Sequence, residues 1–212
     1  MRIKTFTFNE FSENTYVLYD ETKESVIIDP GCNSKAEREE LTGFIKDNQL
    51  KPVLLINTHC HIDHILGNAV VASTYGLALG AHRGEQSVLD SGRQVSAMYG
   101  IPYEVSPDIT VFYNEHDEIT FGQSRVKVLY TPGHSPASIC LYEENSRQVI
   151  AGDVLFEGSI GRTDLPGGDY DTLIHSIKTR LFTLPDEVKV YPGHGPSTTI
   201  GYEKKYNPCF ND

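Results

Sequence analysis

The chain has no tryptophan, two methionines and four cysteines, and it has little positive charge. The cysteines are scattered without a C-x-x-C pair, and a reducing compartment is the simplest account of them. No apolar run approaches the length of a membrane span, and the first residues lack the continuous apolar segment of a signal peptide. These absences predict a cytoplasmic protein that does not bind membranes.

The charge balance excludes another class of partner. Lysine and arginine number 18 against 29 acidic residues, which gives a formal net charge of -11, and no basic stripe is present. A nucleic-acid surface is therefore not expected. The length of 212 residues, with no repeat or linker, predicts one large domain spanning residues 1–212.

The pattern of apolar residues predicts an α/β protein. The first half has β-type runs at residues 3–8, 15–19, 25–29 and 53–57, and helical patterns at 34–48, 67–75 and 85–98. Ser34 and Glu37 have the spacing of a capping box, which indicates where the first helix begins. The second half has strands at 118–121, 125–130, 138–143, 148–151 and 188–191, and a helix at 171–184. The β-α-β order in the first half favours parallel pairing.

One run of seven residues, 58–64, is dense in metal-ligand types. It reads THCHIDH and offers His59, His61, Asp63 and His64 directly after an apolar strand. Imidazole and carboxylate suit Zn²⁺ and its neighbours, and a catalytic ion needs about three protein ligands plus an open position. Four candidate ligands in a tight loop therefore suffice to start two sites. Cys60 lies between two of them, but alternation turns its side chain away, which favours a packed residue.

Three further candidates follow strand-like runs in the second half. His134 and His194 each end a Pro-Gly-His turn, and Asp153 lies between these two turns in the sequence. We expect His134 to join His59 and His61 on one ion, and His194 to join the second. Two dications about 3.5 to 4 Å apart need a bridging anion, and Asp153 is predicted to place one oxygen on each. The other histidines, His82, His116 and His175, lie in no such run and are predicted to be ordinary surface or core residues.

The order T-H-x-H-x-D-H, G-H, G-D, G-H resembles the metallo-β-lactamase superfamily over nearly the whole chain. Its members include glyoxalase II, persulfide dioxygenases, nucleases, lactonases and β-lactamases. The resemblance implies a four-layer αβ/βα sandwich with two mixed sheets and metals along one edge.

Two segments narrow the branch. Residues 161–169, GRTDLPGGD, resemble a stretch shared by short glyoxalase II-like hydrolases and persulfide dioxygenases, and the end of the chain resembles the short, single-domain glyoxalase II type. The further helical domain of long glyoxalase II enzymes is expected to be absent. We therefore predict hydrolysis of a small-molecule thioester, similar to S-lactoylglutathione, by a hydroxide held between two ions, with Asp63 orienting it. Zn²⁺ is favoured, with Fe and Mn as alternatives.

Several residues are candidates to bind substrate or to support the metals. Arg162 either forks onto a substrate carboxylate or pairs with Asp164 to brace its loop. Exposed residues near the end of the chain are further candidates, namely Tyr202, Lys204, Lys205 and Tyr206. Asp29 is a candidate to accept the outer N–H of a ligand histidine. Asn14 and Asp29 are equally interpretable as turn residues.

Three other functions stay open at this point. A mononuclear iron persulfide dioxygenase would use His59, His134 and Asp153 as its three ligands. A different ester, lactone or phosphodiester hydrolase of the same fold is a second alternative, and a non-catalytic metal-binding module is the third. The oligomeric state is not predicted.

Overall fold

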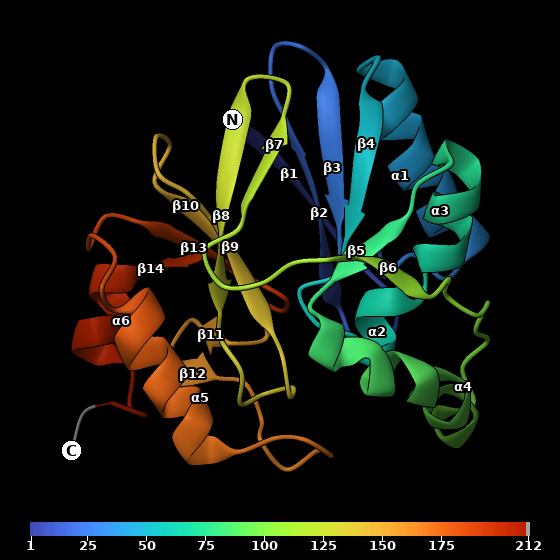
Figure 1. The fold of residues 1–212 in the computed structure, drawn as a ribbon. Helices are drawn as coiled ribbons and strands as arrows, with labels where there is room; N and C mark the ends of the chain where they lie inside the picture. The colour runs from blue at the N-terminus through green and yellow to red at the C-terminus, as the bar shows by residue number, and fades with distance from the viewer. Residues whose placement is uncertain (211–212) are drawn as a thin grey trace. The chain divides into compact units, whose positions relative to one another are not determined.

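The computed structural model describes residues 1–210 (Figure 1). Contacts divide the chain into two compact units. Unit 1 comprises residues 1–113 and 120–125, and unit 2 comprises residues 114–119 and those from 126 onward. Within the described residues, no helix has the length and apolar character that crossing a membrane requires. The single domain predicted for residues 1–212 stays a prediction.

Unit 1 is built on a six-stranded mixed sheet. In spatial order its strands are β1 (Arg2–Phe8), β2 (Glu13–Tyr19), β3 (Glu24–Ile28), β4 (Lys51–Ile56), β5 (Leu79–Ala81) and β6 (Ile109–Phe112). The pairs among β1, β2 and β3 are antiparallel, and those from β3 to β6 are parallel, which confirms the predicted parallel pairing. The short strands β5 and β6 were not predicted.

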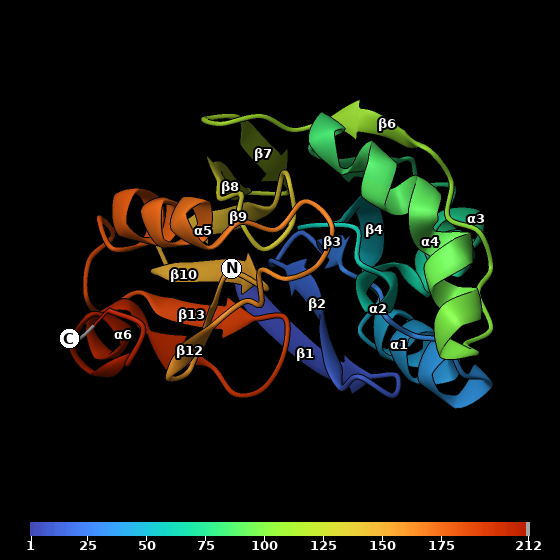
Figure 2. The same ribbon diagram turned by 90° about the horizontal axis from the view of Figure 1, so that it is seen from below.

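Helices cover this sheet on one side (Figure 2). They are α1 (Lys35–Asp47), α2 (Ile62–Ile65), α3 (Asn68–Tyr75), the 3₁₀ turn η1 (Arg83–Glu85) and α4 (Gln86–Tyr99). The predicted capping box is present, because Ser34 accepts from the Glu37 N–H and Glu37 accepts from the Ser34 N–H. Helix α4 continues through Gly92, where a Cβ would lie 3.1 Å from the Tyr103 ring, so a packing contact explains this glycine.

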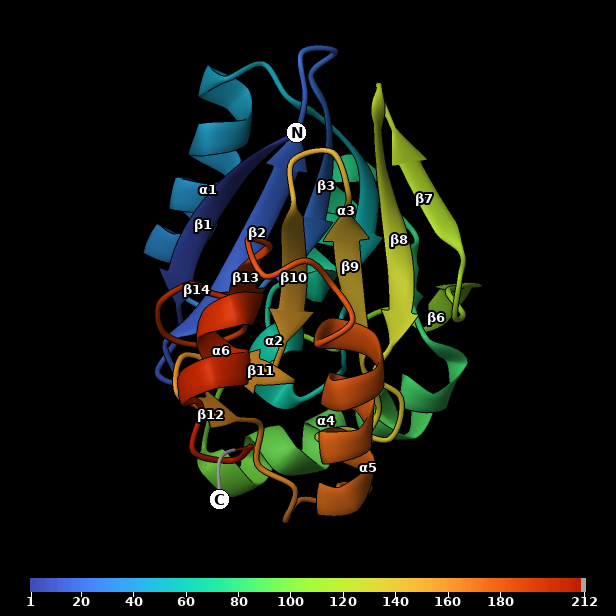
Figure 3. The same ribbon diagram turned by 90° about the vertical axis from the view of Figure 1, so that its left-hand side faces the viewer.

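Most of the second six-stranded mixed sheet belongs to unit 2, and residues 120–121 of β7 and 124–125 of β8 are assigned to unit 1 (Figure 3). In spatial order its strands are β14 (Thr198–Thr199), β13 (Lys189–Pro192), β10 (Gln148–Gly152), β9 (Ile139–Glu143), β8 (Ser124–Tyr130) and β7 (Glu118–Phe121). Strands β10 and β13 pair in parallel, and β8–β9, β9–β10 and β13–β14 are antiparallel. A separate hairpin is formed by β11 (Leu155–Phe156) and β12 (Ser159–Ile160).

The helices of unit 2 pack through apolar residues. Helix α5 (Tyr170–Ser176) continues as a π turn, η2 (Ile177–Leu181), and α6 (Ile200–Tyr206) follows β14. The buried apolar side chains of these helices include Leu173, Ile177 and Leu181, which pack with Val149 and Val190 of the sheet. The predicted helix at 171–184 is therefore an α-helix and a π turn that end earlier. Two mixed sheets with helices confirm the α/β prediction.

Candidate metal centre

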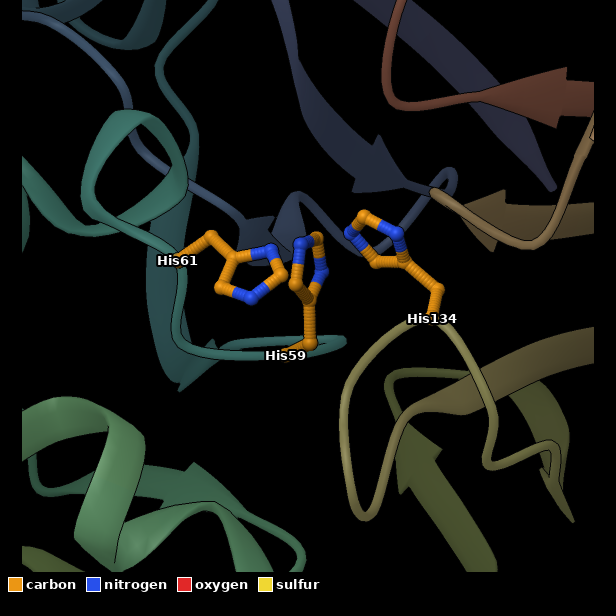
Figure 4. Close-up of side chains that lie close together, drawn as sticks. All are labelled: His59, His61 and His134. Atoms are coloured by element: carbon orange, nitrogen blue, oxygen red, sulfur yellow. The ribbon is translucent and has the colours of Figure 1, made fainter. Parts of the chain in front are cut away.

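In unit 1, the four candidate ligands of residues 58–64 follow β4. His59 lies in the segment after the strand, His61 is the N-cap of α2, and Asp63 and His64 lie inside this short helix. The expectation of a tight loop throughout was therefore wrong for Asp63 and His64. The His59 and His61 ring centroids are 4.8 Å apart with the rings edge to face (Figure 4), and those of His59 and His64 are 4.1 Å apart. The His64 Nε2 atom is 3.6 Å from Asp63 Oδ2.

The buried carboxylate of Asp29 supports the ligand run of residues 58–64 through hydrogen bonds. Asp29 follows β3 with a φ of 48°, and it is 1% exposed. Its Oδ1 accepts from the Thr58 N–H at 2.7 Å, and its Oδ2 accepts from the Thr58 hydroxyl at 2.6 Å. The same Oδ2 lies 3.2 Å from His64 Nδ1. Asp29 therefore lies where a carboxylate could accept the outer N–H of His64, and this role of Asp29 stays a prediction. Asn14, by contrast, lies within β2 rather than in a turn.

Two further buried carboxylates were missed by the sequence analysis. Glu85 Oε2 accepts from the Cys60 N–H at 2.9 Å, between two candidate ligands. Glu13 accepts from the Thr15 hydroxyl at 2.9 Å, and burial raises the pKa of its carboxyl well above the usual value. No local pattern distinguishes either residue from an exposed acid, because each is defined by distant contacts. Burial, followed by the Glu85 charge, raises the pKa of the Cys60 thiol well above its usual value, so Cys60 is a packed thiol as predicted.

In unit 2, the three candidates come from three separate loops. His134 follows β8, Asp153 directly follows β10, and His194 follows β13. The Asp153 Oδ2 atom lies 3.5 Å from His134 Nε2 and 3.5 Å from His194 Nε2. The expected arrangement, with one carboxylate oxygen toward each ion, differs from this geometry, in which the same oxygen is near both rings.

These distances fit a metal site. Ligand atoms about 2.0 to 2.2 Å from a tetrahedral zinc ion lie roughly 3.3 to 3.6 Å from one another. A hydrogen bond between a ring nitrogen and a carboxylate is shorter, at about 2.7 to 3.2 Å. The His134 Nδ1 atom is 2.7 Å from the Arg162 carbonyl oxygen, which can only accept, so we assign the ring proton to Nδ1. His134 Nε2 is then available as a ligand.

The candidate substrate residues are engaged elsewhere. Arg162 donates from Nε and Nη2 to the two carboxylate oxygens of Asp164, each at 2.7 Å, and both side chains are exposed. Lys204 donates to Asp186 Oδ1 at 2.6 Å. On α6, the Lys205 ammonium is 4.9 Å from the centroid of the Tyr206 ring, which contacts Tyr202 at a centroid distance of 5.1 Å. The structure therefore shows the pairing of Arg162 with Asp164, and both the bracing of the loop and substrate binding by these residues stay predictions.

The remaining histidines have ordinary positions. The His82 Nδ1 atom accepts from the Gly84 N–H at 3.1 Å and so caps η1. His116 is 85% exposed, and His175 lies exposed on α5. Their exclusion from the candidate ligands agrees with these positions.

Known proteins resemble the chain over its full length. The family model described as "Metallo-beta-lactamase superfamily" matches residues 9–194. The hydroxyacylglutathione hydrolase GloC of Haemophilus influenzae is 35% identical, with 100% of this chain and 99% of that protein covered.

Solved structures agree with this match. The BLEG-1 B3 metallo-beta-lactamase is 35% identical with a TM-score of 0.90, and both chains are covered completely. TTHA1623, solved in a di-iron-bound form, is 34% identical with a TM-score of 0.86 over 97% of this chain and 98% of its own. ETHE1 from Myxococcus xanthus is 29% identical with a TM-score of 0.81 over 98% and 84%. The chain belongs to the metallo-beta-lactamase superfamily of metallo-hydrolases.

Proposed function

We propose that the chain is a thioester hydrolase of glyoxalase II type that uses two divalent ions. The observation that carries the proposal is the Asp153 Oδ2 atom, 3.5 Å from the Nε2 atoms of both His134 and His194. A carboxylate oxygen near two ligand nitrogens suits an anion shared by two cations. The ligands assigned to one ion are His59, His61 and His134, those of the other are Asp63, His64 and His194, and Asp153 serves both.

The chain's residues divide the chemical work. When bound, two divalent ions would lower the pKa of water to near 7 and polarise the substrate carbonyl. Asp63, at the start of α2, is the group assigned to orient the attacking water. Asp29 is assigned to hold the His64 ring, since its Oδ2 lies 3.2 Å from Nδ1. A thiolate is a good leaving group, so no protein acid is required.

The substrate class is inferred from the relatives and from the charge. A protein named hydroxyacylglutathione hydrolase is 35% identical over essentially the whole of both chains, which supports a glutathione thioester or a similar small molecule. Because the net charge of -11 repels an anionic thioester at long range, binding must come from local positive groups. The metals and Lys205 on α6 are the candidates. We propose a cytoplasmic enzyme that binds neither nucleic acid nor membranes.

The metal is proposed from the donor set. Histidine nitrogen and carboxylate oxygen suit Zn²⁺, Fe and Mn alike. Zn²⁺ is favoured for hydrolysis, while the similar structure of TTHA1623 in a di-iron-bound form supports iron as the alternative.

The function is tested on the purified protein with three substrates. We expect steady hydrolysis of S-lactoylglutathione, measured as loss of thioester absorbance, with no oxygen uptake on glutathione persulfide. A β-lactam is included because a similar structure is that of a B3 metallo-beta-lactamase. Turnover of the β-lactam alone, or no turnover of any thioester by the metal-loaded protein, contradicts the proposal.

A second candidate is the mononuclear iron persulfide dioxygenase. The similarity to ETHE1, with a TM-score of 0.81 at 29% identity, is the observation that keeps this alternative open. It requires one iron per chain and oxygen consumption on a persulfide, so the same assay with an oxygen electrode separates the two candidates.

A further inference from the structure

The segment of residues 161–169 holds the loop that carries His134. The Arg162 carbonyl oxygen is 2.7 Å from His134 Nδ1 at one end of the segment. At the other end, the Asp169 N–H donates to the Gly133 carbonyl at 2.8 Å. Between them, a Cβ on Gly167 would lie 2.9 Å from Pro136, so the backbone packs closely on the same loop. The segment therefore contacts the loop on both sides of His134.

The first residue of the segment allows a close backbone approach. A Cβ on Gly161 would lie 1.9 Å from the Asp153 carbonyl oxygen and 3.0 Å from the His134 ring. Contacts under 3.0 Å to backbone atoms cannot be relieved by a side-chain rotation. Only glycine fits at this position. The segment thus begins against two candidate metal ligands.

The ion pair of Arg162 and Asp164 braces the backbone around the Arg162 carbonyl group. Two parallel hydrogen bonds of 2.7 Å join the guanidinium to the carboxylate two residues later. The hydrogen bond from Arg162 lowers the pKa of Asp164 to about 2, so the pair is charged at neutral pH. Exposed ion pairs contribute little to stability, which leaves geometry as the main effect of this one.

We propose that the Arg162–Asp164 ion pair positions His134: it holds the Arg162 carbonyl where it binds the Nδ1–H, so that Nε2 faces the metal. Arg162 is then a positioning residue rather than a substrate clamp. The inference rests on the proposed function only in taking His134 as a metal ligand. Backbone carbonyls that hold the outer N–H of a ligand histidine raise its basicity and fix its orientation.

The metal test uses Arg162→Ala, Asp164→Ala and the double variant. The variants keep the Arg162 carbonyl but loosen its position, so we expect a several-fold loss of Zn²⁺ affinity, smaller than the roughly 10- to 100-fold loss that follows removal of an outer partner, measured by competition with a chelator. All three variants should weaken binding equally, because each breaks the same pair. Arg147→Ala is the matched control, since Arg147 and Glu187 form an ion pair of similar exposure in the same unit. Its Zn²⁺ affinity should not change.

The ring proton supplies a readout that needs neither metal nor turnover. Two-bond ¹H–¹⁵N spectra of the metal-free protein should show His134 in the Nδ1–H form, with its signals assigned by their loss in His134→Ala. Arg162→Ala and Asp164→Ala should show a mixture of tautomers, and Arg147→Ala should not. A thioesterase assay that fails while these shifts are seen would reject the proposed function and leave the positioning role intact.

Two results would overturn the inference. One is an unchanged tautomer and unchanged Zn²⁺ affinity in both single variants. The other is a split between them, in which Arg162→Ala raises KM for a carboxylate-bearing thioester while Asp164→Ala lowers it. That split would identify Arg162 as a substrate clamp that Asp164 restrains.

Discussion

The two units supply their candidate ligands in different ways. Unit 1 provides four within residues 58–64, supported by buried carboxylates from elsewhere in the unit. Unit 2 provides one ligand from each of three loops, held by backbone contacts and close glycine approaches. His64 in unit 1 is fully buried, whereas the side chain of His194 in unit 2 is 27% exposed.

This difference predicts which substitutions reduce the stability of the fold and which reduce metal binding. Buried polar groups such as Asp29 and Thr58 must keep their partners whether or not a metal is bound. The three ligands of unit 2 lie on loops, where His134 and Asp153 are buried and His194 is partly exposed, and their removal should disturb the metal-free fold less than loss of the hydrogen bonds of Asp29. Substitutions in the support of unit 1 should therefore reduce stability, and those in unit 2 should mainly reduce metal binding.

The largest effect is expected for Asp153→Ala. Its Oδ2 is 3.5 Å from both ring nitrogens of unit 2, so its removal should release both ions and lower turnover by several orders of magnitude. Metal content after dialysis, measured by mass spectrometry, checks this. His194→Ala is the comparison variant, since it should weaken the binding of one ion only. Two tightly held ions in Asp153→Ala would show that the bridging assignment is wrong.

Asp63→Asn should lower turnover nearly as much while leaving the fold intact. The amide keeps the shape of the side chain but removes the charge that orients the attacking water and helps hold the second ion. Circular dichroism monitors the fold, and steady-state kinetics report the loss. Full activity in this variant, with one metal per chain, would argue against a two-ion mechanism.

Asp29→Ala sharpens the contrast in stability. The carboxylate accepts from the Thr58 N–H and hydroxyl, so its loss should destabilise the metal-free protein by about 3 kcal/mol in urea unfolding. Asp29→Asn tolerates the φ of 48° and should lose less. Asp153→Ala should cost the metal-free protein within about 1 kcal/mol. Equal losses for Asp29→Ala and Asp153→Ala would remove the proposed difference between the units.

Local signals predicted most elements of the fold. The capping box at Ser34 and Glu37 and the apolar spacing after it predicted α1 to within a residue, since a helix start depends on nearby residues. Strand β5 was missed because its three residues are too few to show a period, and β6, with four, was missed although β7 of the same length was predicted.

The candidate site was only partly predictable. The ligand types in residues 58–64 and the two Pro-Gly-His turns were visible in the sequence, but their support was not. Glu85 reaches Cys60 across 25 positions of the chain, and the need for glycine at 161 comes from the Asp153 carbonyl. Helix α2 was missed because its four residues are part of the ligand run and carry no apolar repeat.

The smallest effect concerns the thiols. Burial raises the pKa of Cys32 and of Cys140 to about 12, and it raises that of Cys60 well above its usual value. At pH 8 these three should be protonated and slow toward a thiol reagent, and the half-buried Cys209 should react first. One fast thiol per chain is expected, with three more on unfolding. Rapid reaction of Cys60 in the native protein would reopen a metal or catalytic role for it.

We propose that the ligands of both units hold one pair of ions, and anomalous diffraction from crystals of the metal-loaded protein tests this proposal. We expect two metal peaks about 3.5 to 4 Å apart. One should be bonded by His59, His61 and His134, the other by Asp63, His64 and His194, and both by Asp153. A single peak, or two peaks each bonded by residues of one unit alone, would contradict the account.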